Sequence, residues 1–298
     1  MTDNHRQPER RPIIFASLIK SMNLIIQATH PVAATHLSHL ANLAQSKQRE
    51  QIAEHIYRLP EAQAHPEIAP YCFEHQLDYG FVPRGRSLKD FGLLVMDMDS
   101  TLIAIECIDE IADMQGLKPQ VAAITEAAMR GELDFAESLR RRVALLEGLD
   151  ERALQRVYDE RLQLNPGAEI MLARVKEHGI MTLLVSGGFV FFTERIKARL
   201  QLDFAHANTL EIIDGKLTGR VLGKIFDAQG KADWLVKIRE ELELGPEQVI
   251  AMGDGANDLK MMARAGISIA YHAKPVVREQ ASYALNFVGL DGLVNLLA

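Results

Sequence analysis

The segment Asp97-Met-Asp-Ser-Thr101 places two carboxylates one residue apart, directly after the apolar run 91–96. Side chains alternate in direction along an extended chain, so Asp97 and Asp99 leave the end of the predicted strand on the same side. Two such carboxylates repel each other, and a hard cation such as Mg²⁺ relieves that repulsion. A carboxylate beside a cation can also attack phosphorus and form an aspartyl-phosphate. A strand followed by an ordinary Asp/Ser turn is the alternative for this pentapeptide alone.

Two further polar segments follow apolar runs. Gly253-Asp-Gly-Ala-Asn-Asp258 adds the carboxylates of Asp254 and Asp258, and four acids brought together would make an oxygen-rich Mg²⁺ site. Ser186-Gly-Gly188 precedes a helical pattern, and a serine hydroxyl with amides at a helix N-terminus suits a phosphate group. Taken singly, each segment fits an acidic turn or a helix cap equally well or better.

Lys231 stands at the start of a predicted helix over 231–244, where the helix dipole disfavours a cation. A nearby phosphate or carboxylate cluster would offset that cost. Other nucleotide and hydrolase motifs do not fit, because Ala232 follows this lysine and Leu184 occupies the first glycine position of a G-x-S-x-G elbow.

Four apolar runs predict buried parallel strands, at residues 93–96, 179–185, 249–252 and 267–270. Helical patterns separate them, which indicates an α/β fold: a Rossmann-like parallel sheet with helices on both faces. Ligands bind such sheets outside the carboxyl ends of the strands, where the polar segments stand. The helical stretch at about 105–165 is too long for one crossover and predicts a cap inserted after the first core strand. Asp214-Gly215 predicts a hairpin over 208–223.

The residues before the core are expected to form a smaller region. We assign residues 1–85 to an N-terminal α+β region and residues 86–298 to the core with its cap. A strand at 24–27 and a helix at 36–44 are predicted within that region, and residues 1–12 are expected to be disordered.

Composition limits the function classes. The chain of 298 residues has a net charge of −7, which does not favour nucleic acid as a partner, and no apolar run approaches the length of a membrane span. Cys72 and Cys107 form no C-x-x-C motif. The basic-then-apolar stretch at 6–19 outlines a signal peptide only faintly, because Lys20 interrupts it and no cleavage pattern follows. We therefore predict a cytoplasmic protein with no membrane partner.

Taken together, the order D-x-D-x-T, Ser, Lys and G-D-G-x-N-D over residues 91 to about 290 resembles the haloacid dehalogenase superfamily. Residues 97–112 and 129–143 are similar to the members that hydrolyse phosphoserine at the end of serine biosynthesis. The resemblance implies a Mg²⁺-dependent phosphatase with an aspartyl-phosphate intermediate.

The resemblance also implies a role for each matching residue. Asp97 would be the nucleophile, and Asp99 the general acid and then the general base. Mg²⁺ would be bound by Asp97, the carbonyl group of Asp99, and Asp254, with Asp258 in support. The remaining residues would bind the phosphoryl group or the rest of the substrate: Glu106, Phe135, Arg142, Ser186, Gly187, Lys231 and Asn257. Glu106 would meet the substrate's ammonium group and Arg142 its carboxylate.

Three other functions remain open from the sequence. A phosphotransferase that uses homoserine or another small alcohol as acceptor would carry the same catalytic residues. Another small-molecule phosphatase of this fold would not use Glu106 and Arg142 for recognition. A non-catalytic amino-acid-binding regulator is disfavoured because all expected catalytic residues are present. The N-terminal region resembles a reduced amino-acid-binding domain of the ACT type, with His30-Pro31-Val32 in place of its glycine-bearing turn. A packing role or a homodimer contact is expected for it.

Overall fold

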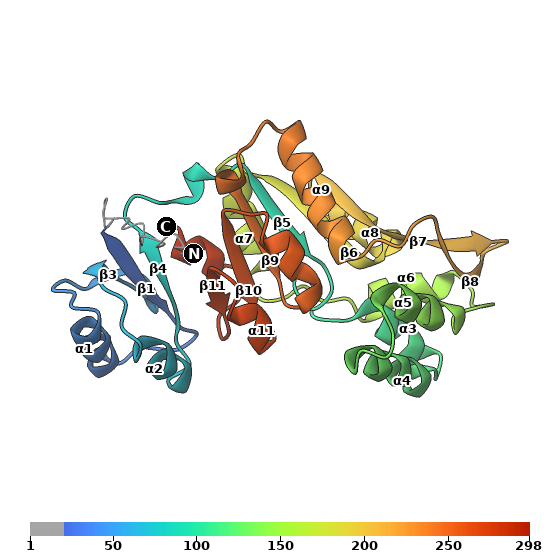
Figure 1. Ribbon diagram of the computed structural model, residues 1–298, viewed down its shortest axis with the longest axis horizontal. Coiled ribbons are helices and arrows are strands. Elements are labelled where there is room, and N and C mark those ends of the chain that lie inside the picture. Colours follow the sequence, from blue (N-terminus) through green and yellow to red (C-terminus); the bar gives the residue numbers. More distant parts are fainter. Residues whose placement is uncertain (1–20) are drawn as a thin grey trace, which may run out of the picture.

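A seven-stranded sheet runs through the middle of the protein (Figure 1), in the order β11-β10-β9-β5-β6-β7-β8. All neighbouring pairs are parallel except β7 and β8. The computed structural model describes residues 21–298, so the predictions for residues 1–12 and 6–19 lie outside the described part. The strands are β5 (Leu93–Asp97), β6 (Met181–Phe189), β7 (Phe204–Ile213), β8 (Lys216–Leu222), β9 (Val249–Gly253), β10 (Ile267–Tyr271) and β11 (Tyr283–Leu285).

Helices cover both faces of this sheet, as the sequence predicts. They are α7 (Ala168–Glu177), α8 (Val190–Leu200), α9 (Ala228–Glu241), α10 (Leu259–Met262) and α11 (Pro275–Arg278). Single-turn 3₁₀ helices lie at Leu88–Asp90, Pro246–Gln248 and Ala256–Asp258. The two cysteines are buried and unpaired. No helix within residues 21–298 combines the length and the apolar character needed to cross a membrane.

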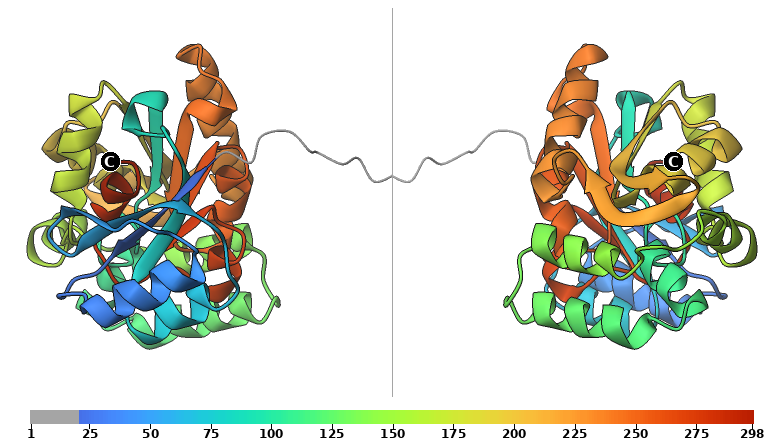
Figure 2. Two further views of the ribbon diagram at one scale, coloured as in Figure 1. Left: turned by 90° about the vertical axis from the view of Figure 1, so that its left-hand side faces the viewer. Right: turned by 90° about the vertical axis from the view of Figure 1, so that its right-hand side faces the viewer.

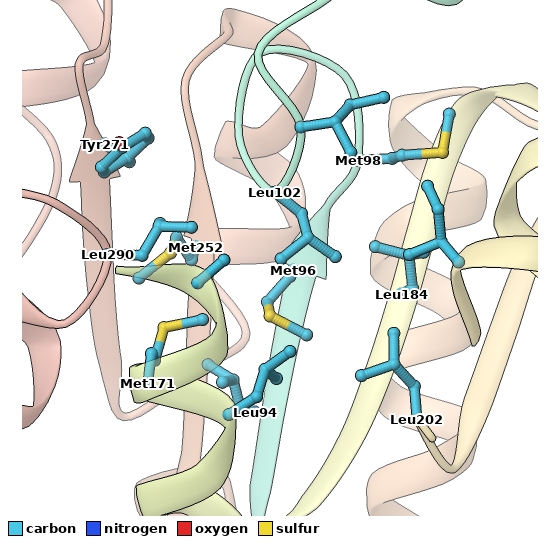
Figure 3. Close-up of a cluster of buried hydrophobic side chains, with 14 of the residues drawn as sticks. Leu94, Met96, Met98, Leu102, Met171, Leu184, Leu202, Met252, Tyr271 and Leu290 are labelled. Carbon is cyan, nitrogen blue, oxygen red and sulfur yellow. The ribbon is translucent and has the colours of Figure 1, made fainter. Parts of the chain in front are cut away.

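The side chains of β5 alternate between two hydrophobic clusters, one on each face of the sheet. Leu94 and Met96 belong to a cluster that includes Met171 of α7 (Figure 3). Leu93 and Val95 belong to the other, with residues of α9 and α10. Burying a large aliphatic side chain contributes about 1.5–3 kcal/mol. Apolar contacts on both faces therefore fix the position of β5, and with it the acidic residues at its end.

Four helices between β5 and β6 form the predicted cap. They are α3 (Cys107–Met114), α4 (Lys118–Met129), α5 (Phe135–Ala144) and α6 (Arg152–Glu160). The side chain of Asp134 accepts a hydrogen bond from the backbone N–H of Glu137 at 2.7 Å and so caps α5. The cap lies at the opposite end of the molecule from the N-terminal sheet (Figure 1).

The predicted hairpin is formed by β7 and β8. Asp214 and Gly215 both have positive φ, 50° and 72°, as a two-residue hairpin turn requires. The hairpin also contacts the cap, because the backbone N–H of Gly148 donates to the carbonyl of Leu217 at 2.8 Å. The hairpin therefore joins the edge of the seven-stranded sheet to the helices of the cap.

The N-terminal region is a four-stranded antiparallel sheet with two helices on one side (Figures 1 and 2). Its strand order, β2-β3-β1-β4, is that of a ferredoxin-like β-α-β-β-α-β unit. The elements are β1 (Met22–Gln27), α1 (Ala34–Leu43), β2 (Glu50–Ala53), β3 (Ile56–Ala62), α2 (Ile68–Glu74) and β4 (Asp78–Pro83). Val82 belongs to β4, where it pairs with Asn23 of β1.

A buried aspartate attaches this N-terminal sheet to the core. The carboxylate of Asp78, 1% exposed, accepts hydrogen bonds from the backbone N–H groups of Asn286, Phe287 and Val288 at 2.8–2.9 Å. The hydroxyl of Tyr283 donates to the carbonyl of Phe81 at 3.1 Å. Close by, helix α12 (Gly292–Leu296) accepts a hydrogen bond from Gln27.

Candidate active site

The candidate site lies where three neighbouring strands end. β5 lies between β9 and β6, with Asp97 opposite Val185 and Met96 opposite Met252. The residues in the last positions of these strands and just after them therefore meet at one edge of the sheet, where the strand order also changes direction. A cavity of about 400 Å³ opens there between the sheet and the cap. Most predicted site residues line it: Asp97, Asp99, Glu106, Phe135, Arg142, Gly187, Lys231, Asp254 and Asn257.

Three carboxylates form the acidic end of this cavity. Oxygen atoms of Asp97, Asp254 and Asp258 all lie within 4.8 Å of one another, close enough to hold one metal ion. The hydroxyl of Thr101 donates to Asp254 at 3.2 Å. Burial raises the pKa of Asp97 well above its usual value, and the charge of Asp258 adds to this effect. The pKa of Asp254 is raised for the same two reasons. Added positive charge would favour the ionised form of both.

Lys231 lies inside this cluster rather than on the surface. It is 1% exposed, and its ammonium group lies 2.6 Å from Asp97 Oδ1 and 2.8 Å from Asp258 Oδ1. Burial lowers the pKa of Lys231, but the charges of Asp258 and Asp97 outweigh that effect and raise it overall. Asp258 is itself held by the backbone N–H of Gly255 at 3.1 Å. The carboxylates thus compensate the placement of a lysine in the first turn of α9.

Asp99 is held by two hydrogen bonds at the other side of the cavity. The hydroxyl of Ser186 donates to Asp99 Oδ2 and the backbone N–H of Cys107 donates to Asp99 Oδ1, both at 2.9 Å. Ser186 is fully buried and also accepts a hydrogen bond from the backbone N–H of Gly188 at 2.8 Å. Its hydroxyl is thus engaged by Asp99, while Gly187 and Gly188 form the adjacent cavity wall.

Groups of both charges lie on the cap side. Glu106 precedes α3 and lines the cavity, although the residue as a whole is exposed. Desolvation of its carboxyl group raises the pKa of Glu106 to about 7, and the charge of Asp99 acts in the same direction. Arg142 on α5 is half-buried. Desolvation lowers its pKa, and the negative charges of Asp109, Glu106 and Asp99 oppose that shift. The cap thus presents a carboxyl group, that of Glu106, and a guanidinium group, that of Arg142, to the same cavity.

Two charged residues of the cavity wall were not singled out from the sequence. Asp109 lies three residues after Glu106 on the same side of α3, and this spacing was the available signal. Lys274 lies three residues after the end of β10 and directly precedes α11. The rule that polar residues gather at strand ends applies to it, but a lone lysine before a proline gives no other signal.

The fold and the site together define a class of enzymes, hydrolases that include phosphoryl-transfer enzymes. Its features here are a parallel sheet, an inserted helical cap and a cluster of aspartates at the strand ends. The chain belongs to the haloacid dehalogenase-like hydrolase family, whose model matches residues 94–263. A domain of unknown function matches residues 24–68.

Three relatives within this family have names that refer to one enzyme, phosphoserine phosphatase. The chain is 55% identical over 215 residues to the phosphoserine phosphatase of Polaromonas sp., which covers 70% of this chain and 91% of the relative. A probable phosphoserine phosphatase from Vibrio cholerae, solved without ligand, superposes with a TM-score of 0.81 and 38% identity over 93% of this chain and 86% of that one. A structure described as a phospho-aspartyl intermediate analogue of phosphoserine phosphatase gives a TM-score of 0.65 and 38% identity, covering 70% of this chain and 99% of that one.

Proposed function

We propose that this protein is a Mg²⁺-dependent phosphoserine phosphatase, which hydrolyses O-phosphoserine to serine and phosphate through an aspartyl-phosphate on Asp97. One observation carries the proposal. The carboxylate of Asp97 lies 2.6 Å from the Lys231 ammonium, within 4.8 Å of two further carboxylates, and lines the same cavity as Asp99. The names of the relatives support the choice of substrate, and one of the related structures represents a phospho-aspartyl state.

The donor atoms of the cluster fit a hard divalent cation. Three carboxylates lie together with one ammonium group, so the cluster carries an excess of negative charge and offers oxygen ligands. Asp97, Asp254 and the carbonyl oxygen of Asp99 would hold Mg²⁺, with Asp258 in support through Lys231. The ion would supply charge neutralisation between an anionic nucleophile and an anionic phosphoryl group.

The residues of the chain divide the chemistry between them. An oxygen of Asp97 attacks phosphorus, the bond from phosphorus to the serine oxygen breaks, and Asp99 donates its proton to that leaving oxygen. Asp99, now ionised, takes a proton from water, which attacks phosphorus and releases Asp97 and phosphate. Lys231, Gly187 and Asn257 line the cavity and bind the phosphoryl oxygens, and Ser186 joins them when its hydroxyl turns from Asp99 to the substrate. Phosphoryl transfer depends mainly on such positioning and charge stabilisation.

Residues of the cap recognise the amino-acid part of the substrate. The ionised carboxylate of Glu106 binds the ammonium group of the substrate, and the guanidinium of Arg142 binds its carboxylate. Phe135 closes the cavity beside Gly187 and excludes water during phosphoryl transfer.

Phosphate release from a substrate panel tests the proposal. Phosphoserine, phosphothreonine and glucose 6-phosphate are compared with Mg²⁺, with a chelator, and after Mg²⁺ is restored. We expect phosphoserine to have the highest kcat/KM and chelation to abolish turnover reversibly. A preference for the sugar phosphate would contradict the roles of Glu106 and Arg142. Transfer to added homoserine in preference to water would favour a phosphotransferase, and no phosphate release with Mg²⁺ would favour a binding protein.

The organisation of the chain adds two proposals. We propose that residues 1–85 and 86–298 form separate units, and that the first serves in packing or in a homodimer. The separate hydrophobic cluster under the N-terminal sheet supports this division. Light scattering of the full chain measures whether a dimer forms. The two unpaired, buried cysteines are compatible with the proposed cytoplasmic location.

A further inference from the structure

Ser100 connects the end of β5 to the substrate-recognising part of the cap. It follows Asp99 directly, and its hydroxyl donates a hydrogen bond of 2.8 Å to Glu106 Oε1. Ser100 also has a φ of 57°, in the left-handed region that residues other than glycine adopt infrequently. A non-glycine side chain in this conformation is held there by its surroundings and is often found at functional sites.

The turn around Ser100 is fixed by hydrogen bonds to its backbone groups, some from the backbone and some from the side chain of Asn165. The N–H of Ser100 donates to the carbonyl of Ile105 at 3.2 Å. The side-chain amide of Asn165, in the second connection between cap and core, donates to the carbonyls of Thr101 and Ile103 at 2.8 and 3.2 Å. The backbone N–H of Asn165 donates to the carbonyl of Leu102 at 3.0 Å. The two connections are thus joined, and the Ser100 hydroxyl has a defined direction.

Glu106 has no other hydrogen-bond donor that fixes its carboxyl group among residues 21–298. It stands at the N-cap of α3 with extended backbone angles (φ −100°, ψ 106°), so the helix does not orient its side chain. A glutamate side chain has several rotatable bonds, and holding it in one direction costs conformational entropy. The hydrogen bond from Ser100 to Oε1 offsets this entropy cost and holds the carboxyl group in one direction, and it leaves Oε2 available to a ligand.

We propose that Ser100 is a positioning residue that aims Glu106 at the ammonium group of the substrate and so sets the selectivity for amino-acid phosphomonoesters. The inference rests on the proposed phosphatase function. It predicts that loss of the Ser100 hydroxyl weakens recognition of the ammonium group more than it weakens phosphoryl transfer.

The test compares phosphoserine with 3-phosphooxypropanoate, which lacks only the ammonium group. Ser100→Gly removes the hydroxyl and accepts the positive φ, so the turn itself is retained. We expect the ratio of kcat/KM for phosphoserine over the analogue to fall on the order of tenfold, the effect of one hydrogen bond to a charged group. The fall should come mainly from a higher KM for phosphoserine. Glu106→Gln should lower the ratio as well, and the double variant should add little to it.

Control variants separate this role from a structural one. Gln201→Gly relieves another positive φ, of 53°, at the exposed end of α8 and should leave the ratio unchanged. Ser100→Ala serves as a second variant without the hydroxyl, with thermal denaturation of each variant to confirm folding. If Ser100→Gly keeps the wild-type ratio of kcat/KM values while Glu106→Gln lowers it, the positioning role of Ser100 is overturned, but recognition by Glu106 is not. A wild-type enzyme that does not distinguish the two substrates would overturn the proposed recognition by Glu106 as well.

Discussion

The ring of Phe135, at the start of α5 in the cap, lies against Gly187, near the end of β6 in the core. A methyl group at position 187 would lie only 2.9 Å from Phe135 Cζ. Both residues line the cavity, and Phe135 remains 37% exposed. The absence of a side chain at 187 therefore allows the cap to approach the site where the phosphoryl group is proposed to bind.

Replacing Gly187 by alanine should hold the cap away from the core. We expect Gly187→Ala to lower kcat/KM for phosphoserine on the order of tenfold or more, because a displaced cap no longer closes the site. Steady-state kinetics of Gly187→Ala, Phe135→Ala and the double variant measure the coupling. The loss caused by the alanine at 187 should be smaller when Phe135 is absent. The same loss in both backgrounds would show that this contact does not matter.

Arg142 and its neighbour Arg141 provide a matched pair. Arg142 faces the cavity, whereas Arg141 is exposed and paired with Glu137 at 2.7 Å. We expect Arg142→Ala to raise the KM for phosphoserine on the order of tenfold or more with a smaller change in kcat, because a charge-assisted contact to the substrate carboxylate is lost. Arg141→Ala should leave both constants within about twofold, as is usual for an exposed ion pair. Equal effects of the two variants would remove Arg142 from substrate recognition.

The pH dependence of selectivity should report on Glu106. Desolvation raises the pKa of this carboxyl group to about 7, so it is neutral at lower pH and ionised at higher pH. Since only the ionised form attracts an ammonium group, the ratio of kcat/KM for phosphoserine over 3-phosphooxypropanoate should rise as the pH increases through about 7. The ratio cancels titrations that both substrates share. In Glu106→Gln it should be flat, and a rise of equal size there would assign the effect to another group.

Asp78 should matter for stability more than for chemistry. Its buried carboxylate accepts three backbone hydrogen bonds from residues 286–288, far from the cavity. We expect Asp78→Ala to lower the free energy of unfolding by about 2–4 kcal/mol, because three buried N–H groups lose their partner. Denaturant titration measures this change, and Asp233→Ala on the surface of α9 serves as the control. Unchanged stability in Asp78→Ala would mean that the N-terminal sheet is not fastened to the core there.

The core of the fold could be predicted because its signals are local. The apolar runs before Asp97, Ser186 and Asp254 identify buried strands, and the rule for parallel sheets then brings the following residues to one edge. The predicted hairpin at Asp214-Gly215 is confirmed for the same reason. The sequence also indicated that Lys231 needed negatively charged neighbours, although it could not show which carboxylates they are.

The remaining features depend on contacts between distant residues. Asp78 bonds to residues more than 200 positions away, and no pattern around it indicates those partners. Asn165 joins two connections that are more than 60 residues apart in the chain, so its role appears only when the cap is in place. In the N-terminal region, β3 contains Pro60 and β4 ends at Pro83, so the hydrophobic pattern of these short strands was too weak to predict them.

The site of covalent phosphorylation tests the central claim most directly. The full-length enzyme is mixed with phosphoserine and Mg²⁺, quenched in acid within the first turnover, and digested for mass spectrometry. The account predicts a hydroxylamine-sensitive acyl phosphate on the peptide that contains Asp97, and neither adduct nor turnover in Asp97→Asn. A phosphoryl group found on another residue, or normal turnover by Asp97→Asn, would contradict it.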